Sequence, residues 1–226
     1  MSGYYDDKLA AERLLKCYEI APPATQAYLE GEIRFVLSRI RPGERVLELG
    51  CGYGRVLARL HPHAGSVIGV DTSRASLALA RRQLAHAENC HLAAMNALSL
   101  AFPDHAFDRV MCIQNGISAF HVDPECLLRE AVRVTRPGGS ALFSSYADSF
   151  WEDRLEWFEA QAAHGLLGEI DRQATRDGVI VCKDGFRATT YRRDDFVSLA
   201  RAIHIEPVIT EVAGSSLFCE VVVPAR

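Results

Sequence analysis

The stretch RVLELGCGYGRV (residues 45–56) sets the expectation for the fold. A short apolar run that carries one acid, Glu48, ends in three glycines, Gly50, Gly52 and Gly54. Glycines directly after a strand permit a sharp turn and let a ligand approach the backbone closely. The stretch therefore predicts a strand, a ligand-binding turn and a helix, and it raises the question of which ligand the turn binds.

Strand-like and helical segments alternate through residues 45–165. Each strand-like run is short and apolar, and it is followed by a helical pattern or a loop. Such alternation predicts an α/β fold with a mostly parallel sheet and helices on both faces. The expected strands are residues 45–50, 65–71, 90–96, 107–114 and 139–147.

The pattern changes after residue 165. The turn pairs Asp177-Gly178 and Asp184-Gly185 lie among β-forming residues and predict short antiparallel strands. The final apolar runs, residues 205–212 and 216–224, are joined by three residues. A parallel crossover needs a dozen residues or more, so these runs predict an antiparallel hairpin.

Two helical patterns, in residues 6–20 and 22–40, precede the first strand. No repeat or low-complexity linker divides the chain, so we expect one domain over residues 1–226. Its expected parts are a helical cap (1–41), a ligand-binding core (42–146), a helix with a small β insert (147–192), and a last helix with the C-terminal hairpin (193–226).

The composition argues against several classes of protein. Lys and Arg number 25 against 29 Asp and Glu, a net charge of −4, so clustered positive charge for nucleic acid is not expected. No run approaches the ~20 apolar residues of a membrane helix, and acids occupy the N-terminus where a signal peptide needs basic residues. We therefore expect a cytoplasmic protein. The seven cysteines lack zinc-pair spacing, which favours free thiols and no metal site.

Asp71 closes the second expected strand, 21 positions after Gly50. A carboxylate at this place accepts hydrogen bonds from both hydroxyls of a ribose. NAD-binding turns share this feature, so Asp71 alone leaves the nucleotide open.

Three details argue against NAD. The sixth position of the dinucleotide fingerprint is Arg55 instead of glycine, and Glu48 would repel a diphosphate. The final hairpin also departs from the parallel strands with which dinucleotide folds continue. A P-loop is excluded because no Gly-Lys-Ser/Thr follows the turn. The turn therefore suits an adenosine whose tail is positively charged and carries no phosphate.

S-adenosylmethionine (SAM) is such a ligand, and residues 40–146 resemble the class I SAM-dependent methyltransferases. The matching segments, in order, are VLELGCGYGR (46–55), VIGVDTS (67–73), NALSLAFPDHAFDRVMC (96–112) and REAVRVTRPGG (129–139). The resemblance implies a Rossmann-like, seven-stranded, mostly parallel sheet whose last strand is antiparallel. It also implies SAM as cofactor and S-adenosylhomocysteine (SAH) as product.

The resemblance implies roles for individual positions. Glu48 would face the amino end of SAM, Asp71 would bind the ribose hydroxyls, and Asn96, in place of the family's usual acid, would bind the adenine through its amide. Plainer alternatives remain open: a structural loop acid, a helix cap and a turn residue, respectively. The expected cofactor-binding residues are Glu48, Gly50, Cys51, Gly52, Gly54, Asp71, Thr72, Asn96, Ala97 and Gln114.

The methyl acceptor is expected at the carboxyl ends of the strands, where open sheets bind ligands. His121 and Tyr146 are the catalytic candidates, His121 because imidazole titrates near neutral pH; it is equally compatible with a solvated residue before a helix. Tyr5, Tyr18 and Asn115 are expected to contact the substrate or form a lid. Further candidates at these ends are Tyr4, Gln114 and Trp151.

The sequence therefore predicts a methyltransferase that acts on a small molecule, like the quinone and natural-product enzymes of this family, as a monomer or homodimer. No Asn-Pro-Pro-Tyr-like element follows the fourth strand, which argues against methylation of nucleic-acid bases. A protein acceptor, a non-catalytic SAM- or SAH-binding sensor or scaffold, and an NAD(P)-linked reductase are the alternatives.

Overall fold

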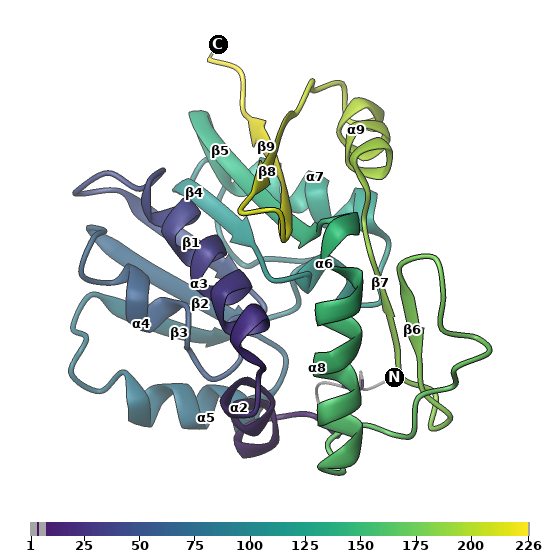
Figure 1. Cartoon of the computed structure of the whole chain (residues 1–226). Helices are drawn as coiled ribbons and strands as arrows, with labels where there is room; N and C mark the ends of the chain where they lie inside the picture. The colour runs from purple at the N-terminus through teal and green to yellow at the C-terminus, as the bar shows by residue number, and fades with distance from the viewer. Residues whose placement is uncertain (1–3, 5–7, 226) are drawn as a thin grey trace.

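Strands and helices alternate along the chain as the sequence predicts (Figure 1). The computed structural model describes residue 4 and residues 8–225. The elements within them are α2 (Glu12–Glu19), α3 (Pro23–Leu37), β1 (Arg45–Leu49), α4 (Leu57–Leu60), β2 (Ser66–Asp71), α5 (Arg74–Gln83), β3 (Cys90–Ala94), β4 (Phe107–Cys112), α6 (Gly116–Ala119), α7 (Pro124–Val134), β5 (Thr135–Tyr146), the 3₁₀ turn η1 (Asp148–Phe150), α8 (Trp151–Ala163), β6 (Val179–Val181), β7 (Arg187–Thr189), α9 (Arg193–Ala202), β8 (Val208–Val212) and β9 (Ser216–Val222).

Seven strands form the main sheet in the order β3-β2-β1-β4-β5-β9-β8. The pairs from β3 to β5 are parallel, whereas β9 runs antiparallel to both of its neighbours. This arrangement confirms the predicted seven-stranded sheet with an antiparallel last strand. A separate antiparallel pair, β6 and β7, forms the predicted β insert.

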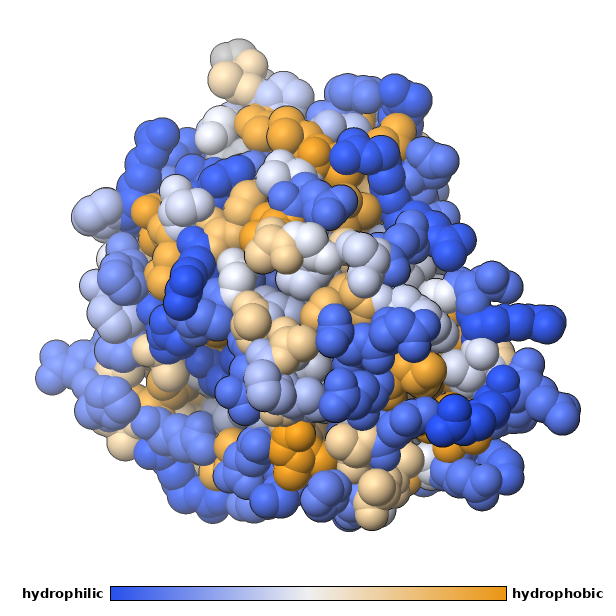
Figure 2. Space-filling view, viewed as in Figure 1, coloured by the Kyte–Doolittle hydropathy of each residue, from blue (hydrophilic) through white to orange (hydrophobic). Residues whose placement is uncertain are grey.

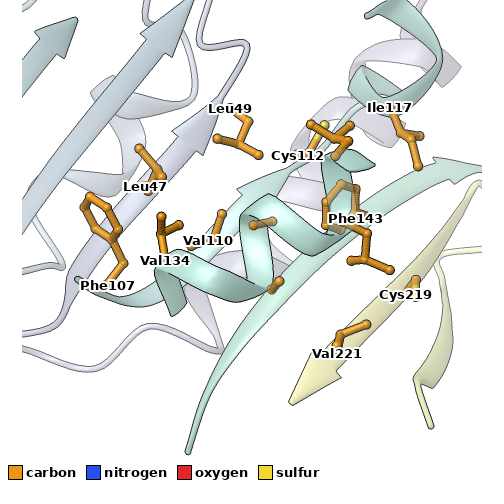
Figure 3. Packing of buried hydrophobic residues seen from close by; sticks show 14 of the residues in the cluster. Leu47, Leu49, Phe107, Val110, Cys112, Ile117, Val134, Phe143, Cys219 and Val221 are labelled. Atoms are coloured by element: carbon orange, nitrogen blue, oxygen red, sulfur yellow. The ribbon is translucent and has the colours of Figure 1, made fainter. Parts of the chain in front are cut away.

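The central strands are apolar on both faces because helices cover both sides. Leu47 and Val110, paired in register on β1 and β4, belong to the core on the α7 side. Figure 3 shows this cluster, with Val134 of α7 and Phe143 of β5 packed over the same sheet face.

The neighbouring residues on the same strands point to the opposite face, as strand geometry requires. Val46 and Met111 are fully buried there against Ile33 and Val36 of α3. Pro23 at the first position of α3 starts this helix, in agreement with the predicted proline start. The two cores together fix β1 and β4 rigidly beneath their carboxyl ends.

A third apolar cluster joins α2, α8 and the β6–β7 hairpin. The Trp157 indole N–H of α8 donates a hydrogen bond to the Cys17 carbonyl of α2 at 2.9 Å. The Ala11 N–H, just before α2, donates to the Ser76 hydroxyl of α5 at 3.0 Å. Figure 1 accordingly places α2 between α5 and α8, where it caps the sheet.

Two helices differ from the prediction. The helix expected after the glycine turn is only the short α4, because turn backbone occupies most of residues 50–56. The first expected helix begins at Glu12 in the structure, and part of its predicted start lies outside the described residues.

The molecular face in Figure 2 is mostly hydrophilic, with scattered apolar side chains. Among the described residues, the large apolar side chains that are exposed are Val208 and Val222, on β8 and β9. No helix within residues 8–225 combines the length and apolar character needed to cross a membrane.

Candidate cofactor and acceptor site

A cavity of about 960 Å³ lies at the carboxyl ends of β1, β2 and β4. One part of its wall is formed by the glycine turn after β1, the end of β2, residues 95–98 and the segment from β4 to α6. The other part is formed by α2, α8 and the β6–β7 hairpin. The cavity therefore lies between the sheet and its cap, where both halves can contact one ligand.

The glycine turn after β1 is tightly packed. Gly50 has a φ of +73°, and a Cβ atom there would lie 2.5 Å from the Phe120 ring. Gly52 has a φ of +53°, and its Cβ would lie 3.0 Å from Leu14 of α2. Glycine is required at Gly50 both for the left-handed backbone and for the space it leaves beside the cavity.

Gly54 lies on the side of the glycine turn that faces α5. It is absent from the cavity wall, and a Cβ at this residue would lie 2.7 Å from the Leu84 side chain, just after α5. Gly54 thus permits the close packing of the turn against α5. The cavity is lined instead by Gly50, Cys51 and Gly52, and burial raises the pKa of the Cys51 thiol well above its ordinary value.

Asp71 joins the end of β2 to the glycine turn. One carboxylate oxygen accepts a hydrogen bond from the Gly52 N–H at 2.8 Å, and the other accepts from the Ser73 N–H at 2.8 Å. The helix cap of α5 is Ser73, whose hydroxyl accepts from the Ser76 N–H. Each carboxylate oxygen can accept more than one hydrogen bond. Asp71, which lines the cavity, can therefore hold the turn and still accept a hydrogen bond from a ligand in the cavity.

Glu48 is only 5% exposed, and its Oε2 atom has no hydrogen-bond partner. Burial raises the pKa of Glu48 to about 8; nearby Arg55 opposes this rise, and the negative charge of Asp71 adds to it. A buried carboxyl without a partner is costly. Its place in the cavity wall fits a cationic ligand group.

Arg55 was not expected from the sequence as a site residue. Its guanidinium lies over the Tyr18 ring of α2, 4.3 Å from the ring centre, and donates a hydrogen bond to Oε1 of Gln114. Arginine has only donors, so the amide oxygen must face Arg55 and the amide nitrogen must face away. Gln114 Nε2 and Arg55 Nε are both buried without a hydrogen-bond partner, and both residues line the cavity.

The turn after β4 has an unusual backbone. Gln114 and Asn115 have φ values of +57° and +59°, the left-handed region that side chains other than glycine seldom adopt. The Asn115 amide donates to the Thr189 carbonyl at 3.1 Å and accepts from the Ser145 hydroxyl at 2.8 Å. Asn115 thus ties this turn to the β6–β7 hairpin and to β5.

The residues expected near the adenine lie together in the cavity wall. Thr72, Asn96 and Ala97 all line it. The Asn96 side chain is exposed, and its oxygen already accepts from the Leu98 N–H at 2.9 Å. Asn96 is therefore a turn-forming residue at the edge of the cavity.

The two catalytic candidates differ in their surroundings. His121 lines the cavity as an exposed residue with a φ of +50°. Tyr146 is 5% exposed and packs against Tyr28, with 5.0 Å between the ring centres, and beneath the Arg154 guanidinium. Burial raises the pKa of the Tyr146 phenol, which therefore stays protonated near neutral pH.

Tyr18, which the sequence predicts as a lid or substrate contact, lines the cavity, and its ring contacts the rings of Tyr53 and Trp157. Tyr5 lies outside the described residues. Trp151 lines a smaller, separate cavity of about 360 Å³. Among the described residues, no group of His, Cys, Asp and Glu side chains is arranged to hold a metal ion.

The chain is similar to known methyltransferases in sequence. Residues 46–139 match the family model described as a methyltransferase domain. An arsenite methyltransferase from Aquipseudomonas alcaligenes is 34% identical over 67% of this chain and 48% of its own length. A ubiquinone/menaquinone biosynthesis C-methyltransferase from Vibrio vulnificus is 32% identical over 59% of this chain and 54% of its own. The chain thus spans about half the length of these curated relatives.

The fold is similar as well. A SAM-dependent methyltransferase from Methanosarcina mazei has 17% sequence identity and a TM-score of 0.63, with 85% of this chain and 98% of that one covered. The strand order, the antiparallel β9 and the glycine turn beside Asp71 agree with this likeness. Residues 46–139 thus match a methyltransferase domain, and the fold is that of the class I SAM-dependent methyltransferases, a family whose cofactor is SAM.

Proposed function

We propose that this protein transfers a methyl group from SAM to a small-molecule acceptor. The observation that carries the proposal is Glu48, a buried carboxyl with an unpartnered oxygen beside the glycine turn. A cation is needed to offset the loss of hydration when such a group ionises. The ammonium group of an amino-acid ligand supplies that cation, and Asp71 lies on the next strand to receive a ribose.

The other unpartnered atoms fit the rest of the ligand. The Nε2 amide group of Gln114 and the guanidinium of Arg55 are donors that suit the carboxylate of an amino acid. Asp71 would accept from the ribose hydroxyls, and Thr72 would contact the adenine. Positive and negative groups in this wall thus match a zwitterionic nucleoside.

When bound, SAM supplies a methyl group that its sulfonium has already activated. The task left to the protein is to align an acceptor and exclude water. Aromatic side chains from α2, α8, β5 and the β6–β7 hairpin line the cavity and serve this task. They are Tyr18, Tyr146, Trp157, Phe158 and Phe186.

This aromatic wall favours a small acceptor with an apolar part. Relatives that are named for arsenite and for quinone biosynthesis support a non-protein acceptor. We assign Tyr146 to the wall, because a phenol with a raised pKa is a poor proton acceptor near neutral pH. His121 at the exposed edge remains the candidate for receiving a proton from the acceptor.

The proposal is tested by incubating the protein with methyl-labelled SAM and a metabolite extract. We expect label in low-molecular-weight products, and we expect Asp71→Ala to abolish the transfer. Label in protein alone would indicate a protein acceptor. SAH binding without any transfer would indicate a sensor or scaffold, and binding of NADH but not SAH would overturn the proposal.

A further inference from the structure

A second buried acid, Glu32 of α3, lies behind the wall of the site. It is 0% exposed and is absent from the cavity lining. Its Oε2 atom accepts hydrogen bonds from the Gln114 N–H at 2.7 Å and from the Ser144 hydroxyl at 2.8 Å. Its Oε1 atom accepts from the Ser216 hydroxyl. One carboxyl therefore joins α3 to the end of β4, to β5 and to β9.

The position of this carboxyl is costly for stability. Burial raises the pKa of Glu32 to about 7, although its hydrogen bonds favour the ionised form. A carboxyl whose pKa rises on folding stabilises the fold most below its unfolded pKa, and that stability is lost as the pH rises through the folded pKa. Ionised Glu32 thus opposes folding above about pH 7. A neutral amide of the same shape would remove this penalty.

The bond from Glu32 to Gln114 holds a strained backbone in place. Gln114 adopts its left-handed φ of +57° while its N–H is bound by Glu32 and Ser144. Strained backbone of this kind persists where the surroundings fix it, and it is concentrated at functional sites. On the other side of the turn, Arg55 binds the side-chain oxygen of the same residue.

We propose that Glu32 is a positioning residue that fixes the Gln114 turn so that the amide N–H group of Gln114 faces the aminoacyl end of the cofactor. The inference rests on the proposed function, because that function assigns the amide to the cofactor carboxylate. Glu32 itself touches no ligand. It acts through the Gln114 backbone, whereas Arg55 binds the Gln114 side chain and also lines the cavity.

The phenols and the thiol around Glu32 do not titrate near neutral pH, whereas Glu48 of the same site has a pKa of about 8. Tyr28, one turn earlier on α3, and Tyr146 at the end of β5 are buried phenols with raised pKa values. Cys112 at the end of β4 is a buried thiol whose pKa is also raised. Arg154, over the Tyr146 ring, stays charged throughout. The ionisation of Glu32 between pH 6 and pH 8 is therefore separated from that of Glu48 by comparing the wild type with a Glu32 variant.

The test compares SAH binding to the wild type and to Glu32→Gln by calorimetry at pH 8 and pH 6. Glutamine keeps the shape but only mimics the protonated acid. We expect Glu32→Gln to bind SAH about tenfold more weakly at pH 8, since the charge-assisted hydrogen bond that Glu32 accepts from the Gln114 N–H becomes a weaker neutral one. At pH 6 the wild-type acid is itself mostly protonated, so the two proteins should differ less than twofold. Titration of Glu48 changes the SAH affinity of both proteins alike, so it cancels in the ratio of the two affinities.

Thermal unfolding separates positioning from a merely structural role. Glu32→Gln should melt at the same or a higher temperature than the wild type at pH 8, while it binds SAH more weakly. The matched control is Glu44→Gln, which removes another buried acid, paired with Arg109 at the opposite end of β1. This control should lower the melting temperature and leave SAH binding unchanged.

Equal SAH affinity of Glu32→Gln and the wild type at pH 8 overturns the inference. So does a ratio of their SAH affinities that is the same at pH 6 and at pH 8. Ser144→Ala removes a neighbour of the same turn and serves if Glu32→Gln does not fold; it should weaken SAH binding at pH 8, and unchanged binding would contradict the inference. Failure of the wild type to bind SAH at pH 8 would instead overturn the proposed function.

Discussion

The carboxylate of Asp71 accepts a hydrogen bond from the backbone N–H of Gly52 at 2.8 Å. The end of β2 and the turn after β1 are therefore locked together before any ligand binds. The Ser73 N–H donates a hydrogen bond to the other oxygen, so both oxygens of the carboxylate are held in place. This bond makes Asp71 a support for the glycine turn, and in the proposed function the same carboxylate accepts from the ribose hydroxyls.

Asp71→Ala should reduce SAH affinity by roughly 100-fold, because it removes charged acceptors for the ribose and loosens the turn. Asp71→Asn keeps one acceptor oxygen, so its SAH affinity should lie between those of the wild type and Asp71→Ala. Calorimetric titration with SAH measures both variants. Wild-type affinity in Asp71→Ala would exclude the carboxylate from the binding site.

Glu48 should release a proton when SAH binds. Its raised pKa of about 8 leaves it mostly protonated at pH 7 in the free protein, and an ammonium partner favours the ionised form. Titrations in buffers of different ionisation enthalpy should give close to one proton released per SAH at pH 7. In Glu48→Gln the release should vanish and binding should weaken, whereas persistent release would assign the proton to another group.

Gly50→Ala should abolish SAH binding while the protein still folds. The added Cβ would force the Phe120 ring to move within the cavity wall and would strain the backbone at a φ of +73° by about 1 kcal/mol. Gly43→Ala is the matched control, since Gly43 has a φ of +88° with no atom within 4 Å of the added Cβ. Both variants should lose similar thermal stability, and SAH binding should be lost only in Gly50→Ala.

Arg55→Lys should weaken SAH binding about tenfold. Lysine retains the charge but loses the planar group that stacks on Tyr18 and binds Gln114. Arg59→Lys, at a solvent-exposed ion pair with Glu30, should bind SAH as the wild type does. Equal SAH affinity of Arg55→Lys and Arg59→Lys would show that SAH binding does not depend on the planar guanidinium of Arg55.

Much of the fold could be predicted because its signals are local. The apolar run before Gly50 and the short join at residues 213–215 each depend on a few neighbouring residues. The same locality brought Glu48 and Asp71 to one edge of the sheet, since the carboxyl ends of adjacent parallel strands must meet there.

The partners of Gln114 could not be predicted in the same way. Arg55 and Glu32 lie 59 and 82 positions from it in the chain, and only the packed sheet brings them together. The helical pattern of α3 indicated one buried face around Ile33, but β5 and β9 cover Glu32 as well. The packing of Gly54 against Leu84 and Ala80 could not be predicted, because a glycine that faces a helix has the same sequence signal as one that faces a ligand.

A crystal structure of the protein with SAH would show which residues bind each part of the ligand. We expect the ribose hydroxyls on Asp71, the ammonium group at Glu48 and the amino-acid carboxylate near Gln114 and Arg55. A ligand bound outside this cavity, or an ammonium group with no contact to Glu48, would contradict this expectation.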